Sequence, residues 1–187
     1  MTRATHRLMA LIVLSGLLLG AGPAWAQDAA LAVVERIHEV DPTGRYRSVD
    51  TSTRASRTRG DAMLPLDIGM DLEIGDIIEV DAAQVQLRYP SGERLLLGER
   101  SRVVLSGERS LSQSLGEVYY RLKDAFRVQY GTVETVVEGT RFVVIGPQGD
   151  GPIRVRVDEG RVRVSNPDTS VAVDRGEQVS MPTEGAE

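Results

Sequence analysis

Alternation of apolar and polar residues, interrupted by short turns, constrains the fold of this chain more than any other feature. In QVQLRY, residues 84–89, the side chains of Val85, Leu87 and Tyr89 alternate with polar ones, and a turn, PSGE, leads into a returning segment, RLLL. A period of two residues is typical of strands with one buried face. The sequence therefore predicts an all-β fold, a single domain of stacked antiparallel hairpins in the form of a jelly roll or a β-solenoid-like sandwich.

The N-terminal region indicates export. Arg3 and Arg7 precede the apolar run LMALIVLSGLLLGAG. The run is followed by PAWA, in which the small residues Ala24 and Ala26 form an A-x-A pattern. This arrangement is typical of a secretory signal peptide, whereas an uncleaved anchor needs about 20 apolar residues. We expect residues 1–26 to be a signal peptide that is cut between Ala26 and Gln27. The product would be a periplasmic protein with no stable membrane span.

The remaining chain divides by composition. Residues 27–62 are expected to contain an N-terminal strand, in DAALAVVERIHEV, followed by a Ser/Thr/Arg-rich loop. The loop, residues 45–62, has few large apolar side chains, which indicates a long surface loop, an edge excursion or partial disorder. Residues 63–181 are expected to form the β domain, and residues 182–187 a disordered tail.

Composition excludes several classes of function. A net charge of −5 argues against nucleic acid as a partner. The chain has no cysteine, and its only tryptophan, Trp25, lies before the expected cut. His38 is the only histidine after that cut, and no G-x-S-x-G motif accompanies it. We therefore expect no catalytic residues, no metal and no cofactor, and a protein that is not an enzyme.

Carboxylates crowd the segment DIGMDLEIGD. Calcium requires several oxygen ligands that converge from one loop, but the spacing here does not match D-x-[DN]-x-[DN]-G. A turn with outward-pointing acids explains the pattern better. The four carboxylates are Asp67, Asp71, Glu73 and Asp76.

The segment IRVRVDEGRVRVSN, residues 153–166, predicts a hairpin that turns at Glu159 and Gly160. This register would pair Val157 with Val162 on one face. The other face would then carry four arginines, as a recognition patch for a carboxylate, a phosphate or an acidic partner surface. Alternatively, the same arginines pair internally with Asp158, Glu134 or Glu138. The four candidate partner-binding residues are Arg154, Arg156, Arg161 and Arg163.

Glycine also interrupts a strand-like segment in VVEGTRFVV. A glycine inside a strand marks a bulge or a corner when the backbone must bend. We expect Gly139 to lie at such a corner, Thr140 to hydrogen-bond locally there, and Phe142 to enter the core.

Several of these motifs occur in an order that resembles the FecR family of bacterial periplasmic domains. That family shows G-x-v-y-v-r, F-x-V-x-T-P, V-x-G-T-x-F, V-x-E-G-x-V-x-V and a closing G-E/Q-x-V. The chain matches them with GEVYYR, FRV, VEGTRF, VDEGRVRV and GEQV, across about residues 71–181. It departs at Tyr130 and Gly131, in place of T-P, and at Glu138, where arginine is frequent. The structural motif residues are Gly139, Thr140, Phe142, Glu159, Gly160 and Gly176.

The resemblance implies an all-β module without catalysis. In signalling members, a cytoplasmic anti-sigma segment precedes a membrane helix, and the periplasmic domain responds to an outer-membrane receptor. Few residues precede the apolar run in this sequence, so we expect a stand-alone secreted member that does not control a sigma factor directly. Two functions stay open. One is sensing or relaying an envelope signal through a protein partner. The other is a structural or glycan-associated role, with the arginines binding an anionic polysaccharide.

Overall fold

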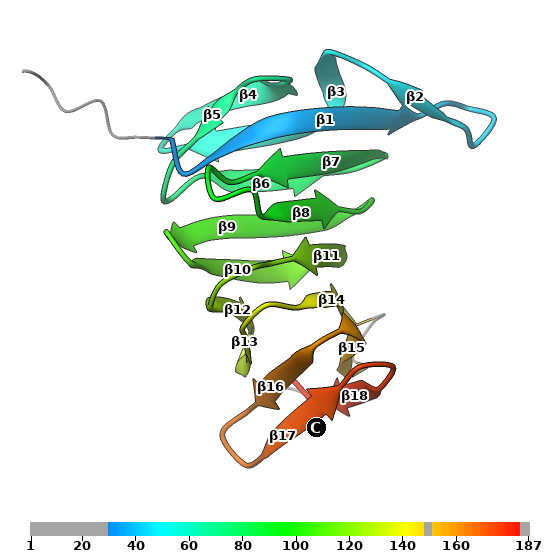
Figure 1. Cartoon of the computed structure of the whole chain (residues 1–187). Helices are drawn as coiled ribbons and strands as arrows, with labels where there is room; N and C mark the ends of the chain where they lie inside the picture. Colours follow the sequence, from blue (N-terminus) through cyan, green and yellow to red (C-terminus); the bar gives the residue numbers. More distant parts are fainter. Residues whose placement is uncertain (1–29, 148–150, 184–187) are drawn as a thin grey trace, which may run out of the picture.

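The computed structural model describes residues 30–147 and 151–183, and all regular structure in this part of the chain is β. Two nine-stranded sheets, here called sheet A and sheet B, form a sandwich (Figure 1). The all-β prediction is therefore confirmed. The expected signal peptide, its cleavage site and the tail from residue 184 lie outside the described residues. None of the described residues belongs to a helix long and apolar enough to cross a membrane.

Each sheet has its own set of strands. Sheet A contains, in spatial order, β18 (Gln178–Met181), β15 (Ile153–Glu159), β14 (Arg141–Ile145), β11 (Glu117–Arg121), β8 (Arg94–Leu97), β7 (Ala83–Arg88), β1 (Ala32–Val40) and β2 (Tyr46–Ser48), with β5 (Asp71–Leu72) also paired to β1. Sheet B contains β17 (Ser170–Asp174), β16 (Arg161–Ser165), β13 (Val133–Val137), β12 (Phe126–Tyr130), β10 (Ser110–Leu115), β9 (Ser101–Gly107), β6 (Ile77–Val80), β3 (Thr51–Arg59) and β4 (Ala62–Asp67).

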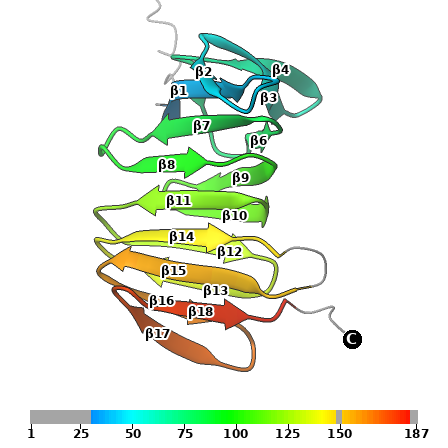
Figure 2. The ribbon, with the colours of Figure 1, turned by 90° about the vertical axis from the view of Figure 1, so that its right-hand side faces the viewer.

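The strands in both sheets follow the order of the chain closely. The chain lays one or two strands in one sheet, crosses to the other, and so advances from β1 at one end to β17 and β18 at the other (Figure 2). Neighbouring strands are antiparallel, apart from the parallel pair β10 and β12. Of the two forms expected, this progressive order is that of the β-solenoid-like sandwich.

Alternation along the strands places one core between the sheets. In β7 the side chains of Val85 and Leu87 are buried, and the polar residues between them are half-buried. Two polar side chains in the core have partners across the sheets. The Tyr120 hydroxyl donates a hydrogen bond of 3.0 Å to Oε1 of Gln113, and the Gln113 amide donates to the carbonyl of Val144 at 3.2 Å.

The expected N-terminal strand is confirmed as β1. Of the alternatives for residues 45–62, a surface loop is wrong over most of the length, whereas an edge excursion agrees with the structure, since β2 is the last strand of sheet A and β3 and β4 are the last two of sheet B. Strand β3 pairs with β4 on one side and with β6 on the other. Apart from its arginines, β3 has small and mostly polar side chains and no large apolar face. Backbone pairing and a few strong contacts therefore hold the strand in the sheet. One such contact is the Glu39 carboxylate, which accepts hydrogen bonds from the Ser52 hydroxyl at 3.0 Å and the Thr53 amide at 2.7 Å.

The expected hairpin across residues 153–166 is also wrong. Strand β15 belongs to sheet A and β16 to sheet B, so the chain crosses between the sheets at Gly160. Val157 pairs with Phe142, and Val162 with Val137. Both strands have a valine face to bury, and in a sandwich these faces meet through the core instead of lying side by side in one sheet.

The corner predicted at Gly139 is confirmed. Gly139 has a φ of +63° and lies between β13 of sheet B and β14 of sheet A. Phe142 enters the core and stacks on Tyr120, with 4.7 Å between the ring centroids. The expected local hydrogen bond of Thr140 is wrong, because its buried Oγ1 has no partner among the described residues.

Candidate functional site

The four arginines predicted to share one face lie on two different sheets. Arg154 and Arg156 are on β15 of sheet A, and Arg161 and Arg163 are on β16 of sheet B. Because β15 and β16 do not pair, Arg163 lies across from Val136 and Ala172, not from Arg156. The structure therefore brings these arginines together as two separate pairs.

Internal pairing accounts for half of this set. Arg156 pairs with Asp158 at 3.3 Å, as one of the alternatives predicted. Arg161 pairs with Asp174 of β17 at 2.5 Å. Glu134 of sheet B, which the sequence suggested as a partner for these arginines, pairs instead with Arg127 at 3.2 Å.

The motif glycines and Glu159 lie where the chain turns or crosses between the sheets. Gly160 connects β15 to β16, and the amide of Gly176 donates a hydrogen bond of 2.8 Å to the carbonyl of Val157. Glu159 is exposed and pairs with Arg141 at 3.0 Å. These positions agree with the structural role expected for the motif.

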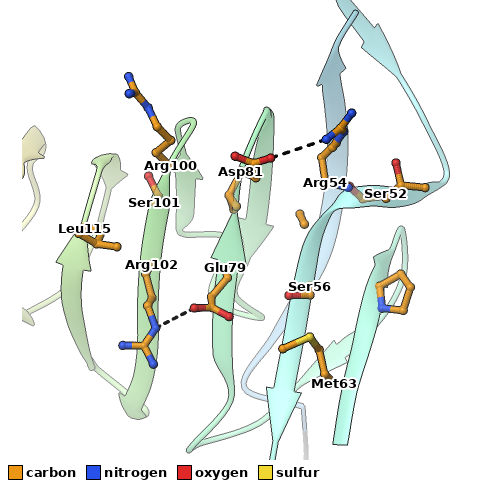
Figure 3. A pocket seen from close by; sticks show the side chains of 14 residues that line it. Ser52, Arg54, Ser56, Met63, Glu79, Asp81, Arg100, Ser101, Arg102 and Leu115 are labelled. Carbon is orange, nitrogen blue, oxygen red and sulfur yellow. Dashed lines mark hydrogen bonds and ion pairs between the residues drawn. The ribbon is translucent and has the colours of Figure 1, made fainter.

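A groove of about 540 Å³ lies on sheet B, where five strands form its floor and walls. We call it the sheet B groove (Figure 3). Strands β3 and β4 form one side of it, β6 and the start of β9 form its middle, and the end of β10 closes the other side. Its lining includes Ser52, Arg54, Ser56, Met63, Pro65, Glu79, Asp81, Arg100, Arg102 and Leu115.

Four of the five charged side chains that line the sheet B groove form two ion pairs, and the fifth is Arg100. Arg102 of β9 and Glu79 of β6 are cross-strand neighbours joined at 3.0 Å, and Arg54 and Asp81 lie 3.8 Å apart (Figure 3). Because each pair is internally neutral, the walls are polar without a strong net charge.

Apolar side chains are exposed on both sides of the groove. Met63 is 63% exposed and Leu115 is 55% exposed, and they stand on opposite sides in Figure 3. An apolar surface bordered by polar groups is typical of a site that docks a protein, and methionine adapts to irregular partners.

Backbone geometry also distinguishes the rim of the groove. Arg100 has a φ of +55°, and it is the one residue other than glycine with a positive φ in the described part of the chain. Such a conformation costs free energy, and these conformations cluster at functional sites. The Arg100 amide donates a hydrogen bond of 2.9 Å to the carbonyl of Asp81, which joins the turn before β9 to the turn after β6.

The carboxylates of residues 67–76 are not arranged as a metal site. Among the described residues, no three side chains of histidine, cysteine, aspartate or glutamate are placed to hold a metal ion. Asp67 and Asp71 are exposed, as expected, but Asp76 is fully buried and accepts a hydrogen bond of 2.6 Å from Nε of Arg59. Burial alone would raise the pKa of Asp76, but hydrogen bonds from Arg59 and the Glu73 amide hold it below its usual value. The outward orientation predicted for Asp76 is therefore wrong.

Sequence reasoning missed the sheet B groove because half of it comes from residues 51–65, most of which were interpreted as loop. The segment TSTRASRTR gave no periodic signal, because its arginines recur after three and then two residues and it has no large apolar residue. A register shift in the pairing of β3 with β4 goes with this irregular spacing.

Comparisons with known proteins agree with the fold. The family model described as FecR protein matches residues 76–163. Two crystal structures of a candidate anti-sigma factor from Parabacteroides distasonis are similar to this chain, with 21% sequence identity and TM-scores of 0.52 and 0.53. The similarity covers 59% of this chain and 56% and 57% of those chains, so it spans a little over half of their length. No curated protein matches the chain.

The matched residues begin at the buried Asp76 and end in β16, and thus include the corner at Gly139 and the crossing at Gly160. The expected motif order, the sandwich of two sheets and the family match agree. Residues 76–163 of this chain therefore match the FecR family model and lie within the two-sheet sandwich.

Proposed function

We propose that the chain is a non-catalytic periplasmic binding module that relays an envelope signal by docking a protein partner in the sheet B groove. The observation that carries this proposal is the exposure of Met63 and Leu115 on either side of walls in which four of the five charged side chains form ion pairs. A surface of this kind binds an apolar side chain of a partner and presents polar groups around it.

The comparisons favour a role in signalling. Residues 76–163 match the FecR family model, and the structures similar to this chain in fold are of a candidate anti-sigma factor. The groove combines strands of these matched residues with β3 and β4, which precede them. This composite origin supports a docking surface particular to this chain.

The alternative function, an envelope component that binds an anionic polysaccharide, depended on four arginines on one face. That arrangement has less support, because the arginines lie on two sheets and two of them pair with acids. Protein docking at the sheet B groove is the better supported proposal.

Photo-cross-linking in cells tests the proposal. A photoreactive residue replaces Leu115, and a matched control replaces Val171, an exposed apolar residue of β17 at the far end of the same sheet. Adducts are identified by mass spectrometry. We expect a discrete protein adduct from position 115 and none from position 171. Adducts to glycan, or the same adducts from both positions, would contradict partner docking in the groove.

A further inference from the structure

Four arginines form a single row across the outer face of sheet A. They lie on four adjacent strands, and the register places Arg88 beside Arg94, Arg94 beside Arg121, and Arg121 beside Arg141. Adjacent strands lie about 4.8 Å apart, so the row spans roughly 14 Å. We call these four residues the arginine row.

Carboxylates pair with three members of the arginine row, and Arg121 is the fourth. Glu35 of β1 pairs with Arg88 at 3.3 Å and with Arg94 at 2.9 Å, and Glu159 pairs with Arg141 at 3.0 Å. Within residues 30–147 and 151–183, no ion pair joins Arg121 to a carboxylate. Each pair of like charges in direct cross-strand contact costs about 0.2–1 kcal/mol. The fold therefore keeps four mutually repelling arginines beside one another, although Glu35 is shared by two of them and Arg121 has no carboxylate partner among the described residues.

A depression of about 320 Å³ lies beside the row, where β8, β11, β14 and β15 begin or end. Four cationic side chains and one carboxylate, Glu159, line it, although the whole chain has a net charge of −5. Lys123, the only lysine in the chain, adds an exposed ammonium group that donates a hydrogen bond of 3.3 Å to the carbonyl of Ser91. The cationic side chains are Arg94, Arg121, Lys123 and Arg141.

An apolar row runs beside the arginine row on the same face. It consists of Leu96 and Tyr119, cross-strand neighbours that lie two residues along their strands from Arg94 and Arg121; Val143, the next residue in register, is fully buried. Two residues correspond to about 6.7 Å along a strand. Tyr119 is 39% exposed, and a depression of about 270 Å³ lies between the two rows.

We propose that this face of sheet A is a second docking surface, which binds an amphipathic helix of a partner protein through an acidic edge. A helix rises about 5.4 Å per turn, close to the separation of about 4.8 Å between strands. Acidic residues one turn apart would therefore reach successive arginines, and an adjoining apolar stripe would cover Tyr119. Arginine favours this use, because its guanidinium binds carboxylate with two parallel hydrogen bonds.

A uniformly charged polymer fits this face less well. It would use the arginine row but leave the apolar row beside it without a partner. The two rows together favour a ligand that has acidic and apolar groups on separate stripes, as an amphipathic helix has.

Binding of a synthetic helical peptide to the purified protein tests the inference. The peptide is alanine-based, with three glutamates one turn apart and leucines on the adjoining stripe, and its control has the same composition in scrambled order. Affinity is measured by fluorescence anisotropy for wild type and for the double variant Arg121→Gln/Lys123→Gln. We expect only the ordered peptide to bind, and the double variant to weaken binding about tenfold, because charge-assisted hydrogen bonds are lost.

The matched control variant is Arg163→Gln/Arg175→Gln, which removes the same charge from exposed positions outside this face. It should leave the affinity unchanged. Equal weakening by both variants, equal binding of the scrambled peptide, or binding of dextran sulfate without binding of the peptide would overturn the inference. Each of these results is independent of the Leu115 cross-link, so failure here is distinguishable from failure of the proposed function.

Discussion

Among single residues, two glycines with positive φ differ sharply in the space around them. A Cβ added to Gly116 (φ +77°) would lie 2.6 Å from the carbonyl oxygen of Arg100 and would also clash with Ser101. A Cβ added to Gly139 (φ +63°) would lie 3.5 Å from the carbonyl oxygen of Lys123, an ordinary contact. We expect Gly139→Ala to cost about 1–2 kcal/mol, from its left-handed backbone alone. Gly116→Ala should cost roughly 1–3 kcal/mol more because of the clash. Urea unfolding measures both, and equal losses would contradict the packing at Gly116.

Substitution of Thr140, unlike substitution of these glycines, is expected to stabilise the fold. Its hydroxyl is buried without a partner among the described residues, and valine has nearly the same shape. We expect Thr140→Val to raise the free energy of unfolding, by up to about 1–3 kcal/mol, because an unsatisfied polar group is removed. Ser101→Ala is the control, since that hydroxyl donates to the carbonyl of Glu117 at 3.1 Å and its removal should destabilise. A lower melting temperature for Thr140→Val would show that the hydroxyl has a stabilising partner.

At the scale of elements, the sequence predicted strands better than it predicted their partners. The β7–β8 hairpin is confirmed, because PSGE supplies a turn between two alternating segments. Strands β15 and β16 alternate equally well, but the chain crosses between the sheets at Gly160. Alternation shows which face of a strand is buried. It does not distinguish two strands that pair within one sheet from two that meet across the core.

The ion pair between Arg59 of β3 and the buried Asp76 should make the stability of the fold depend on pH. The pKa of Asp76 is held below its usual value of 3.8. Its stabilising contribution is therefore complete above that pH and lost as pH falls through the lower pKa of the folded state. We expect Asp76→Asn to lower the free energy of unfolding by about 2 kcal/mol at pH 7. The difference from wild type should shrink below pH 3.8, and urea titrations at pH 7 and pH 3 would show it. An equal deficit at both pH values would mean that ionisation of Asp76 does not stabilise the fold.

For the whole molecule, the order of motifs along the chain was the property of the sequence that informed us most about family and fold. The order of motifs indicated the family, and alternation indicated an all-β fold with one core. The functional surfaces were not predictable in the same way. The arginine row joins residues 88, 94, 121 and 141, which become neighbours only through the register of four strands. The sheet B groove likewise needs β3 and β4 placed beside the residues that match the FecR model.

Export is a further property of the whole molecule that can be measured. We expect the protein in a periplasmic extract to begin at Gln27, because small residues end the apolar run at Ala26. Intact-mass spectrometry of the purified protein checks the cleavage site. A mass that includes residues 1–26, or recovery with the membrane fraction alone, would contradict export with cleavage.

The central claim, that the sheet B groove docks a protein partner, is tested most directly by the cross-link from position 115 in two backgrounds. Met63→Asp places a charge on the apolar side of the groove without disturbing the core, because Met63 is 63% exposed. We predict a discrete protein adduct in the wild-type background and its loss in Met63→Asp, at equal abundance of the two proteins. An adduct that persists unchanged in Met63→Asp, or no protein adduct in either background, would contradict the claim.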